Sequence, residues 1–94
     1  MEKEKDIEKA LVRGIKAAGG IAYKFISPGN VGVPDRLVIL PGGGVIFVEL
    51  KTETGKLSSV QMVQHKRLKD HHQRVTTLYG MHDVERFLSE VRRR

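Results

Sequence analysis

Two acidic residues and a lysine stand at spacings that suit phosphodiester chemistry. Gly-Val-Pro-Asp occupies positions 32–35, and Glu-Leu-Lys follows at 49–51, fourteen residues after Asp35. Each acid lies at one end of an apolar run, so folding the two runs against each other would bring the carboxylates together. Two carboxylates and an ammonium group arranged in this way hold a hard divalent cation beside a phosphodiester. The pattern therefore predicts the site of a metal-dependent nuclease.

The segments that carry these residues are predicted to form a β-hairpin. Residues 36–40 and 45–50 are β-branched and aliphatic, and Pro-Gly-Gly-Gly at 41–44 separates them. This composition is typical of two strands joined by a tight turn. Both strands are apolar on both faces, which requires a sheet that is covered on each side.

The length of the hairpin loop decides whether the acids meet. Side chains alternate along a strand, so Glu49 and Lys51 share one face. Asp35 joins them only if the loop has an odd number of residues or the strand has a bulge. A loop at 41–43 meets that condition, and its glycines supply the positive φ that such a turn needs. The Leu50 carbonyl then lies between the charged side chains as a candidate extra metal ligand.

Simpler interpretations exist for the individual residues. Asp35 follows a proline, and aspartate often begins a turn. Glu49 interrupts a run of apolar residues that should be buried, and a buried carboxylate is costly unless it is paired or metal-bound. Lys51 alone would be a salt-bridge partner of Glu49, but both share a face with the third charged residue. Together the three favour a functional site.

Three further polar residues are candidates for the same site, each with a structural alternative. Glu8 lies in the first turns of a helix, where an acid is favourable, and it borders the apolar stripe from which it could reach the metal or its water. Gln61 has capping-box spacing from Ser58; its functional interpretation is to orient water or phosphate. Lys24 faces either the same groove or solvent.

Hydrophobic periodicity predicts one domain, residues 1–94, of α/β class with the element order αβββαβα. The strand that follows the second helix is expected to be parallel to its neighbour. The expected elements are a helix at 3–18, strands at 21–26, 36–40 and 45–50, a helix from Ser58 to about His71, a strand at 74–79 and a last helix capped by Asp83.

Composition favours a polyanionic partner. Seventeen Lys and Arg oppose eleven Asp and Glu, a net charge of +6, and several acids are needed at the proposed site. DNA or RNA fits such a surface, although a basic surface also serves solubility. The chain has no cysteine, and its four histidines lack the spacing of a zinc site.

The sequence also favours a soluble intracellular protein. No apolar run approaches the ~20 residues of a membrane helix, and the charged N-terminus does not read as a signal peptide. We therefore expect a cytoplasmic location.

These motifs resemble a known family. Gly-Val-Pro-Asp and Glu-Leu-Lys match the PD-(D/E)XK nuclease signature. With the early Glu8, the Pro-Gly-Gly turn and Ser-x-x-Gln ending at Gln61, the chain most resembles the VRR-NUC (virus-type replication-repair nuclease) branch. The resemblance covers nearly the whole chain. One departure is His-His-Gln at 71–73, where members often carry a glycine.

The resemblance implies a restriction-endonuclease-like αβββαβ core with a mixed sheet. It implies Mg²⁺ or Mn²⁺ on Asp35, Glu49 and the Leu50 carbonyl, with Lys51 catalytic. Glu8 would serve a further metal or a water, and Gln61 would support the site. Stand-alone members this small resemble phage proteins, which suggests a homodimer that cuts branched DNA such as four-way junctions.

Two other functional classes remain open on the sequence alone. The same basic surface suits a non-catalytic nucleic-acid-binding module whose acids are structural. The chain could also be a subunit that acts only within a larger replication or repair assembly. Metal-dependent cleavage by the purified chain separates these classes from a nuclease.

Overall fold

The computed structural model describes residues 2–93 and has the predicted order αβββαβα. The predicted helices and strands are present, with small shifts at their ends. The elements are α1 Glu4–Ala17, β1 Ile21–Lys24, β2 Arg36–Ile39, β3 Val45–Lys51, α2 Ser59–Asp70, β4 Val75–Tyr79 and α3 Gly80–Arg92.

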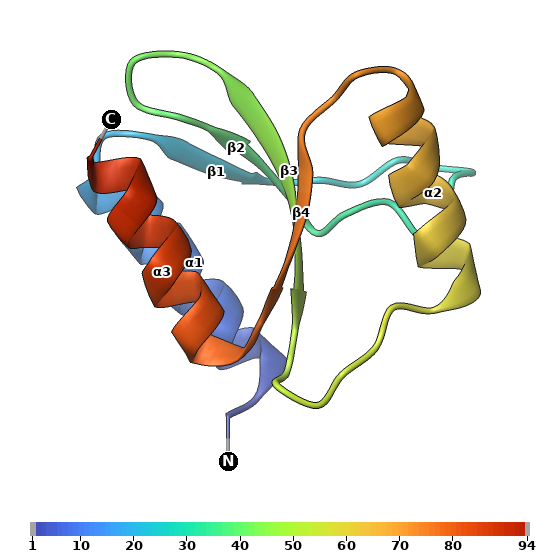
Figure 1. The fold of residues 1–94 in the computed structure, drawn as a ribbon, viewed down its shortest axis with the longest axis horizontal. Coiled ribbons are helices and arrows are strands. Elements are labelled where there is room, and N and C mark those ends of the chain that lie inside the picture. The colour runs from blue at the N-terminus through green and yellow to red at the C-terminus, as the bar shows by residue number, and fades with distance from the viewer. Residues whose placement is uncertain (1, 94) are drawn as a thin grey trace.

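The four strands form one mixed sheet in the order β1-β2-β3-β4. β1, β2 and β3 pair antiparallel, and β4 pairs parallel to β3, as its entry from a helix predicts. α1 and α3 pack against each other on one face of the sheet, and α2, which connects β3 to β4, lies on the other face (Figure 1). The sheet therefore lies between two helical layers, as the apolar strands require.

The face under α1 and α3 holds the hydrophobic core. Alternate strand residues point to this face and meet residues spaced at helical intervals on α1 and α3. Gly14 allows the two helices to approach, because a Cβ at this position would overlap the side chain of Leu88. The buried apolar cluster consists of Ile7, Leu11, Ile15, Val38, Leu40, Ile46, Val48, Leu50, Leu78, Val84, Leu88 and Val91.

The opposite face has a different character. α2 packs against β4, and His65 alone among the α2 residues is buried. Val60 and Val63 on the same helix are 46% and 58% exposed. Phe25 and Phe47 form an edge-to-face aromatic pair with ring centroids 5.3 Å apart. This layer is consequently held by less apolar burial than the core beneath α1 and α3.

The end of α2 carries a non-glycine residue in the left-handed region. His72 has φ of 63°. Its N–H donates to the Lys69 carbonyl at 2.9 Å, and the Gln73 N–H donates to the Leu68 carbonyl at 3.0 Å. These two bonds are a Schellman motif, in which the left-handed residue is usually glycine. His72 therefore takes the left-handed position of this turn, at the bend where members of the resembled family often carry a glycine.

Two sequence-based expectations require correction. α3 begins at Gly80, so Asp83 lies in its first turn instead of preceding it; the Asp83 carboxylate accepts the Tyr79 N–H at 2.8 Å. Lys24 pairs with Arg36 and therefore points to the face opposite Asp35 and Glu49.

Within residues 2–93, no helix combines the length and apolar character needed to cross a membrane.

Candidate metal centre

The β2–β3 hairpin brings Asp35 and Glu49 to the same face of the sheet. Arg36 pairs with Val48, so the next residue outward on each segment places Asp35 opposite Glu49. This register follows from a three-residue loop at 41–43, in which the Leu40 N–H donates to the Gly44 carbonyl and the Gly43 N–H donates to the Leu40 carbonyl. Both glycines of the loop have positive φ. The predicted odd-numbered loop is confirmed.

Backbone contacts on both sides hold Asp35. Its carbonyl accepts the Phe25 N–H at 2.9 Å, and its Oδ2 accepts the Leu50 N–H at 2.9 Å. Pro34 is fully buried, and its restricted φ sets the direction in which the chain enters β2. Because the carboxylate bonds to β3, Asp35 does not serve as a simple turn initiator.

The glycine of the Gly-Val-Pro-Asp segment connects this strand to α2. Gly32 has φ of 98°, and a Cβ at this position would lie 2.8 Å from both Cγ1 and the carbonyl oxygen of Val60. Glycine is needed for the backbone conformation and for the close approach. The segment that leads to Asp35 thus packs on the first turn of α2, which carries further residues of the site.

Glu49 is fully buried beside other charged groups. Its burial, followed by the charge and hydrogen bonding of Asp35, raises the pKa of Glu49 to about 8. The Lys51 ammonium opposes this increase, and the Glu4 carboxylate adds to it. Facing carboxylates resist simultaneous ionisation unless a cation accompanies them.

Glu4, and not Glu8, is the α1 carboxylate near this pair. One oxygen each of Glu4, Asp35 and Glu49 lie within 4.8 Å of one another. The Glu8 Oε2 instead accepts the Arg36 Nε–H at 2.8 Å, so the structure places Glu8 in an ion pair outside the group. Glu4 and Glu8 are one turn apart on the same helix face. Their spacing in the sequence alone does not determine which of the two lies beside Asp35 and Glu49.

Lys51 and Leu50 lie beside the carboxylates on β3. The Lys51 Nζ is 3.9 Å from Glu49 Oε2, on the predicted shared face. The Leu50 side chain is buried in the core, and its N–H donates to Asp35. Its carbonyl, between Glu49 and Lys51 in the chain, stays a predicted ligand.

Gln61 caps α2 and contacts Glu49 with the same side chain. Its Oε1 accepts the Ser58 N–H at 2.9 Å, and its own N–H donates to the Ser58 Oγ at 3.1 Å. Its Nε2 donates to Glu49 Oε2 at 3.1 Å. The capping interpretation is confirmed, and the same side chain also contacts Glu49; that Gln61 orients water or phosphate stays a prediction.

His65 is a neighbour of Glu49 that the sequence patterns did not single out. It is 4% exposed, and its Nε2 lies 3.7 Å from Glu49 Oε1. Burial and the Lys69 ammonium lower the pKa of His65, Asp35 opposes this shift, and Lys51 adds to it. The available signal was its spacing, because residues four apart on a helix share a face and His65 follows Gln61 by four.

The donor set fits a hard divalent cation. Oxygens of Glu4, Asp35 and Glu49 converge, and Glu49 Oε1 is buried with no hydrogen-bond partner in the part of the chain that the structure describes. Carboxylate and carbonyl oxygens are the ligands of Mg²⁺ and Mn²⁺. A cation among them would also offset the charge that opposes ionisation of Glu49.

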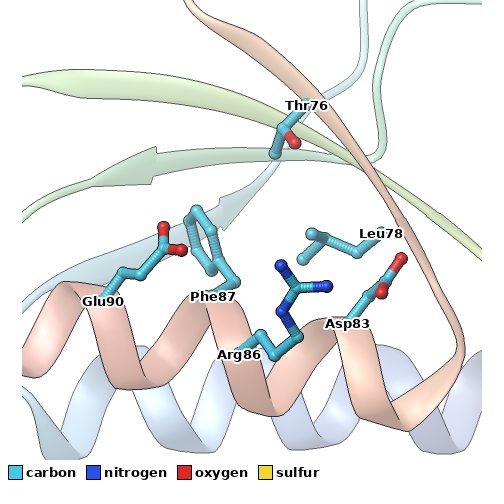
Figure 2. A pocket seen from close by; sticks show the side chains of 6 residues that line it. All are labelled: Thr76, Leu78, Asp83, Arg86, Phe87 and Glu90. Carbon is cyan, nitrogen blue, oxygen red and sulfur yellow. The ribbon is translucent and has the colours of Figure 1, made fainter.

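A separate hollow between β4 and α3 lacks these features. Figure 2 shows its six lining side chains on the face of the sheet covered by α3. Asp83, one of them, accepts the Tyr79 N–H at the start of α3. None of the predicted site residues lines it. The lining residues are Thr76, Leu78, Asp83, Arg86, Phe87 and Glu90.

Comparison with known proteins identifies the family. No family model matches the sequence. A solved structure described as a VRR_NUC domain is 31% identical to this chain, with a TM-score of 0.86 over 95% of this chain and 97% of its own. The chain belongs to the VRR-NUC family. Over 66 residues this VRR-NUC protein is also 54% identical to "Putative nuclease p44" of Acyrthosiphon pisum secondary endosymbiont phage 1, covering 70% of this chain and 71% of that protein.

Membership in the VRR-NUC family agrees with the fold and with the position of the two acidic motifs. The VRR-NUC fold expected from the sequence is confirmed, and VRR-NUC is a nuclease domain family. The segments on which the resemblance was based, 32–35 and 49–51, lie on neighbouring strands and bring their acids together.

Proposed function

We propose that this protein is a Mg²⁺- or Mn²⁺-dependent endonuclease that hydrolyses DNA phosphodiester bonds. The observation that carries the proposal is the convergence of Glu4, Asp35 and Glu49 oxygens beside the Lys51 ammonium. The membership in a nuclease family supports the same reaction. The basic net charge of +6 suits a nucleic-acid substrate.

The protein groups have distinct roles in this proposal. Asp35, Glu49 and the Leu50 carbonyl would hold the cation, and Glu4 would bind it directly or through a water, the role that the sequence assigned to Glu8. When bound, the cation polarises the scissile phosphate and lowers the pKa of a bound water. Lys51 orients that water or stabilises the charge that develops on the phosphate.

The remaining contacts orient these groups. The Leu50 N–H holds the Asp35 carboxylate, and Gln61 holds Glu49 through its Nε2. Gln61 thus acts as a positioning residue in this proposal.

In the proposed hydrolysis, water attacks phosphorus while the bond to the 3′ oxygen breaks. One proton of the water passes to the 3′ oxygen, which leaves a 5′-phosphate and a 3′-hydroxyl.

Cleavage of labelled substrates by the purified chain tests the reaction. We expect Mg²⁺ or Mn²⁺ to support cleavage of single-strand, duplex, flap or four-way-junction DNA, and a chelator to stop it. Binding of these DNAs without metal-dependent cleavage would instead support the non-catalytic binding module. End-group analysis of the products checks the predicted 5′-phosphate.

We further propose that the protein acts as a homodimer on branched DNA. Two symmetric cuts in a four-way junction need two sites, and a C₂ dimer provides both through one self-complementary interface. Ile21, Tyr23 and Val45 are 45%, 58% and 39% exposed and lie on the face of the sheet that α2 covers in part. This apolar surface is the preferred candidate interface.

Light scattering of Tyr23→Glu tests this assembly. The unaltered protein should scatter as a dimer and the variant as a monomer, because a charge would be buried in the interface. Val63→Glu, which alters an exposed apolar residue of α2, is the matched control and should stay dimeric. A monomeric unaltered protein that nicks single sites would remove the junction-resolving role and leave the nuclease proposal in place.

A further inference from the structure

His65 has a position that the proposed chemistry has not used. It is the single buried residue of α2, whose other apolar side chains include exposed Val60, Met62 and Val63. A helix that packs on a sheet normally buries an apolar stripe. Here the side chain that enters the interface is an imidazole directed at Glu49.

Two buried polar atoms face each other at this point. His65 Nε2 and Glu49 Oε1 are 3.7 Å apart, and neither has a hydrogen-bond partner among residues 2–93. The separation exceeds hydrogen-bonding distance by about 0.5 Å. Leaving a buried donor and a buried acceptor unpaired is costly, whereas a small rotation of the carboxylate would bring the two atoms within hydrogen-bonding distance.

Gln61 provides the other half of the same arrangement. Its Nε2 donates to Glu49 Oε2, and it precedes His65 by one helical turn. The two α2 side chains therefore approach the two oxygens of one carboxylate. Each carboxylate oxygen has two lone pairs, so accepting one hydrogen bond leaves a lone pair for a cation.

We propose that His65 is a positioning residue for the metal-binding glutamate, donating its Nε2–H to Glu49 Oε1. Together with Gln61 it fixes the plane of the Glu49 carboxylate so that the free lone pairs face Asp35 and Glu4. The proposal rests on the metal centre proposed above. It assigns α2 a function beyond covering the sheet, because this helix orients a ligand through two polar contacts.

Mn²⁺ binding measured by calorimetry tests the donor role without requiring turnover. His65→Leu keeps an apolar side chain but removes the donor, and we expect Mn²⁺ affinity to fall about 10- to 100-fold, as for other residues that orient ligands. His65→Gln retains an N–H donor and should restore most of the affinity. His82→Leu replaces an exposed histidine on α3 and should bind as the unaltered protein does.

The outcomes separate positioning from packing. Undiminished Mn²⁺ binding by His65→Leu would overturn the proposal, as would equal losses in His65→Leu and His65→Gln. If His65→Leu fails to fold, the comparison of His65→Gln with the unaltered protein decides, and a large loss in the glutamine variant counts against a donor role.

Nitrogen-15 NMR of the imidazole provides a second measurement. In the Mg²⁺-bound protein we expect a proton on Nε2 of His65, protected from exchange, and a shift of its resonance in Glu49→Gln. A proton on Nδ1 alone would overturn the proposal. If the unaltered protein binds no divalent cation, the metal centre itself fails, while the Nε2 resonance in the metal-free protein still decides whether His65 contacts Glu49.

Discussion

The two faces of the sheet divide stability and chemistry between them. Twelve buried apolar residues, contributed by α1, α3 and the strand segments that they cover, form one cluster on one face. On the other face Glu49 of β3 and His65 of α2 are buried, and Gln61 of α2 donates a hydrogen bond to Glu49. The same strands contribute side chains to both faces: Val48 and Glu49 are adjacent on β3, and their side chains point to opposite faces.

The difference shows how a chain of 94 residues accommodates a buried carboxylate. Each buried aliphatic side chain contributes about 1.5–3 kcal/mol, whereas an unpaired buried charge is costly. The apolar face can offset the cost of the polar face because both lie on one hydrogen-bonded sheet. We therefore expect substitutions on the two faces to affect different measurable properties.

The largest effect should follow removal of the central carboxylates. Glu49→Ala or Asp35→Ala should lower cleavage by about 1,000-fold or more, since a bound metal contributes several kcal/mol to transition-state stabilisation. Above pH 8, where Glu49 is ionised, the thermal stability of the metal-free protein should be equal or higher, because either substitution removes negative charge from the cluster. Single-turnover assays and thermal melts check both. Near-normal turnover by either variant would contradict the site.

Lys51→Ala sharpens the contrast within the same site. This variant should lose cleavage activity and still bind Mg²⁺, because the ammonium acts on water or phosphate and is not a metal ligand. Calorimetry beside the cleavage assay measures both properties. Loss of Mg²⁺ binding would show that the Lys51 contact with Glu49, at 3.9 Å, has a structural role.

On the opposite face, Leu11→Ala should reduce the free energy of unfolding by about 2–5 kcal/mol. Leu11 is fully buried in the core, and its truncation leaves a cavity. Because its contacts are on the other side of the sheet, the folded variant should keep its Mn²⁺ affinity. Urea unfolding and calorimetry test the separation. A large fall in Mn²⁺ affinity with little change in the free energy of unfolding would contradict the separation of stability and metal binding between the two faces.

The raised pKa of Glu49 predicts a pH dependence for the metal-free protein. Its pKa is about 8 in the folded state against 4.5 as the ordinary value. The folded state therefore holds the proton more tightly, and this contribution to stability is complete below pH 4.5 and lost as the pH rises through 8. Urea unfolding of the unaltered protein and Glu49→Gln at several pH values measures it. Equal slopes for the two proteins would refute the shift.

The smallest expected effect lies at the end of α2. His72 has φ of 63°, and a non-glycine residue in this region costs about 1–2 kcal/mol. His72→Gly should raise the free energy of unfolding by about 1 kcal/mol, reduced by the greater freedom of glycine in the unfolded chain. Metal affinity should not change. A destabilised variant would mean that the His72 side chain makes a contribution larger than its backbone strain.

Local patterns in the sequence were sufficient for the hairpin and for its acids. Alternation along the strands, together with a loop of three residues, places Asp35 opposite Glu49, because each step along a strand reverses the direction of the side chain. The capping box of α2 was predictable for a similar reason, since its partners Ser58 and Gln61 are three residues apart.

Tertiary packing decided which distant residues join the acids. Glu4 and Glu8 lie on the same side of α1, so the axial position at which α1 packs on the sheet decides which of them lies beside Asp35 and Glu49. The inclusion of His65 depends on the close approach of Gly32 to Val60, which seats α2 above Glu49. The sequence by itself determined the periodicity and the turn that join Asp35 to Glu49, whereas the depth and axial position of each helix arise only when the whole core packs.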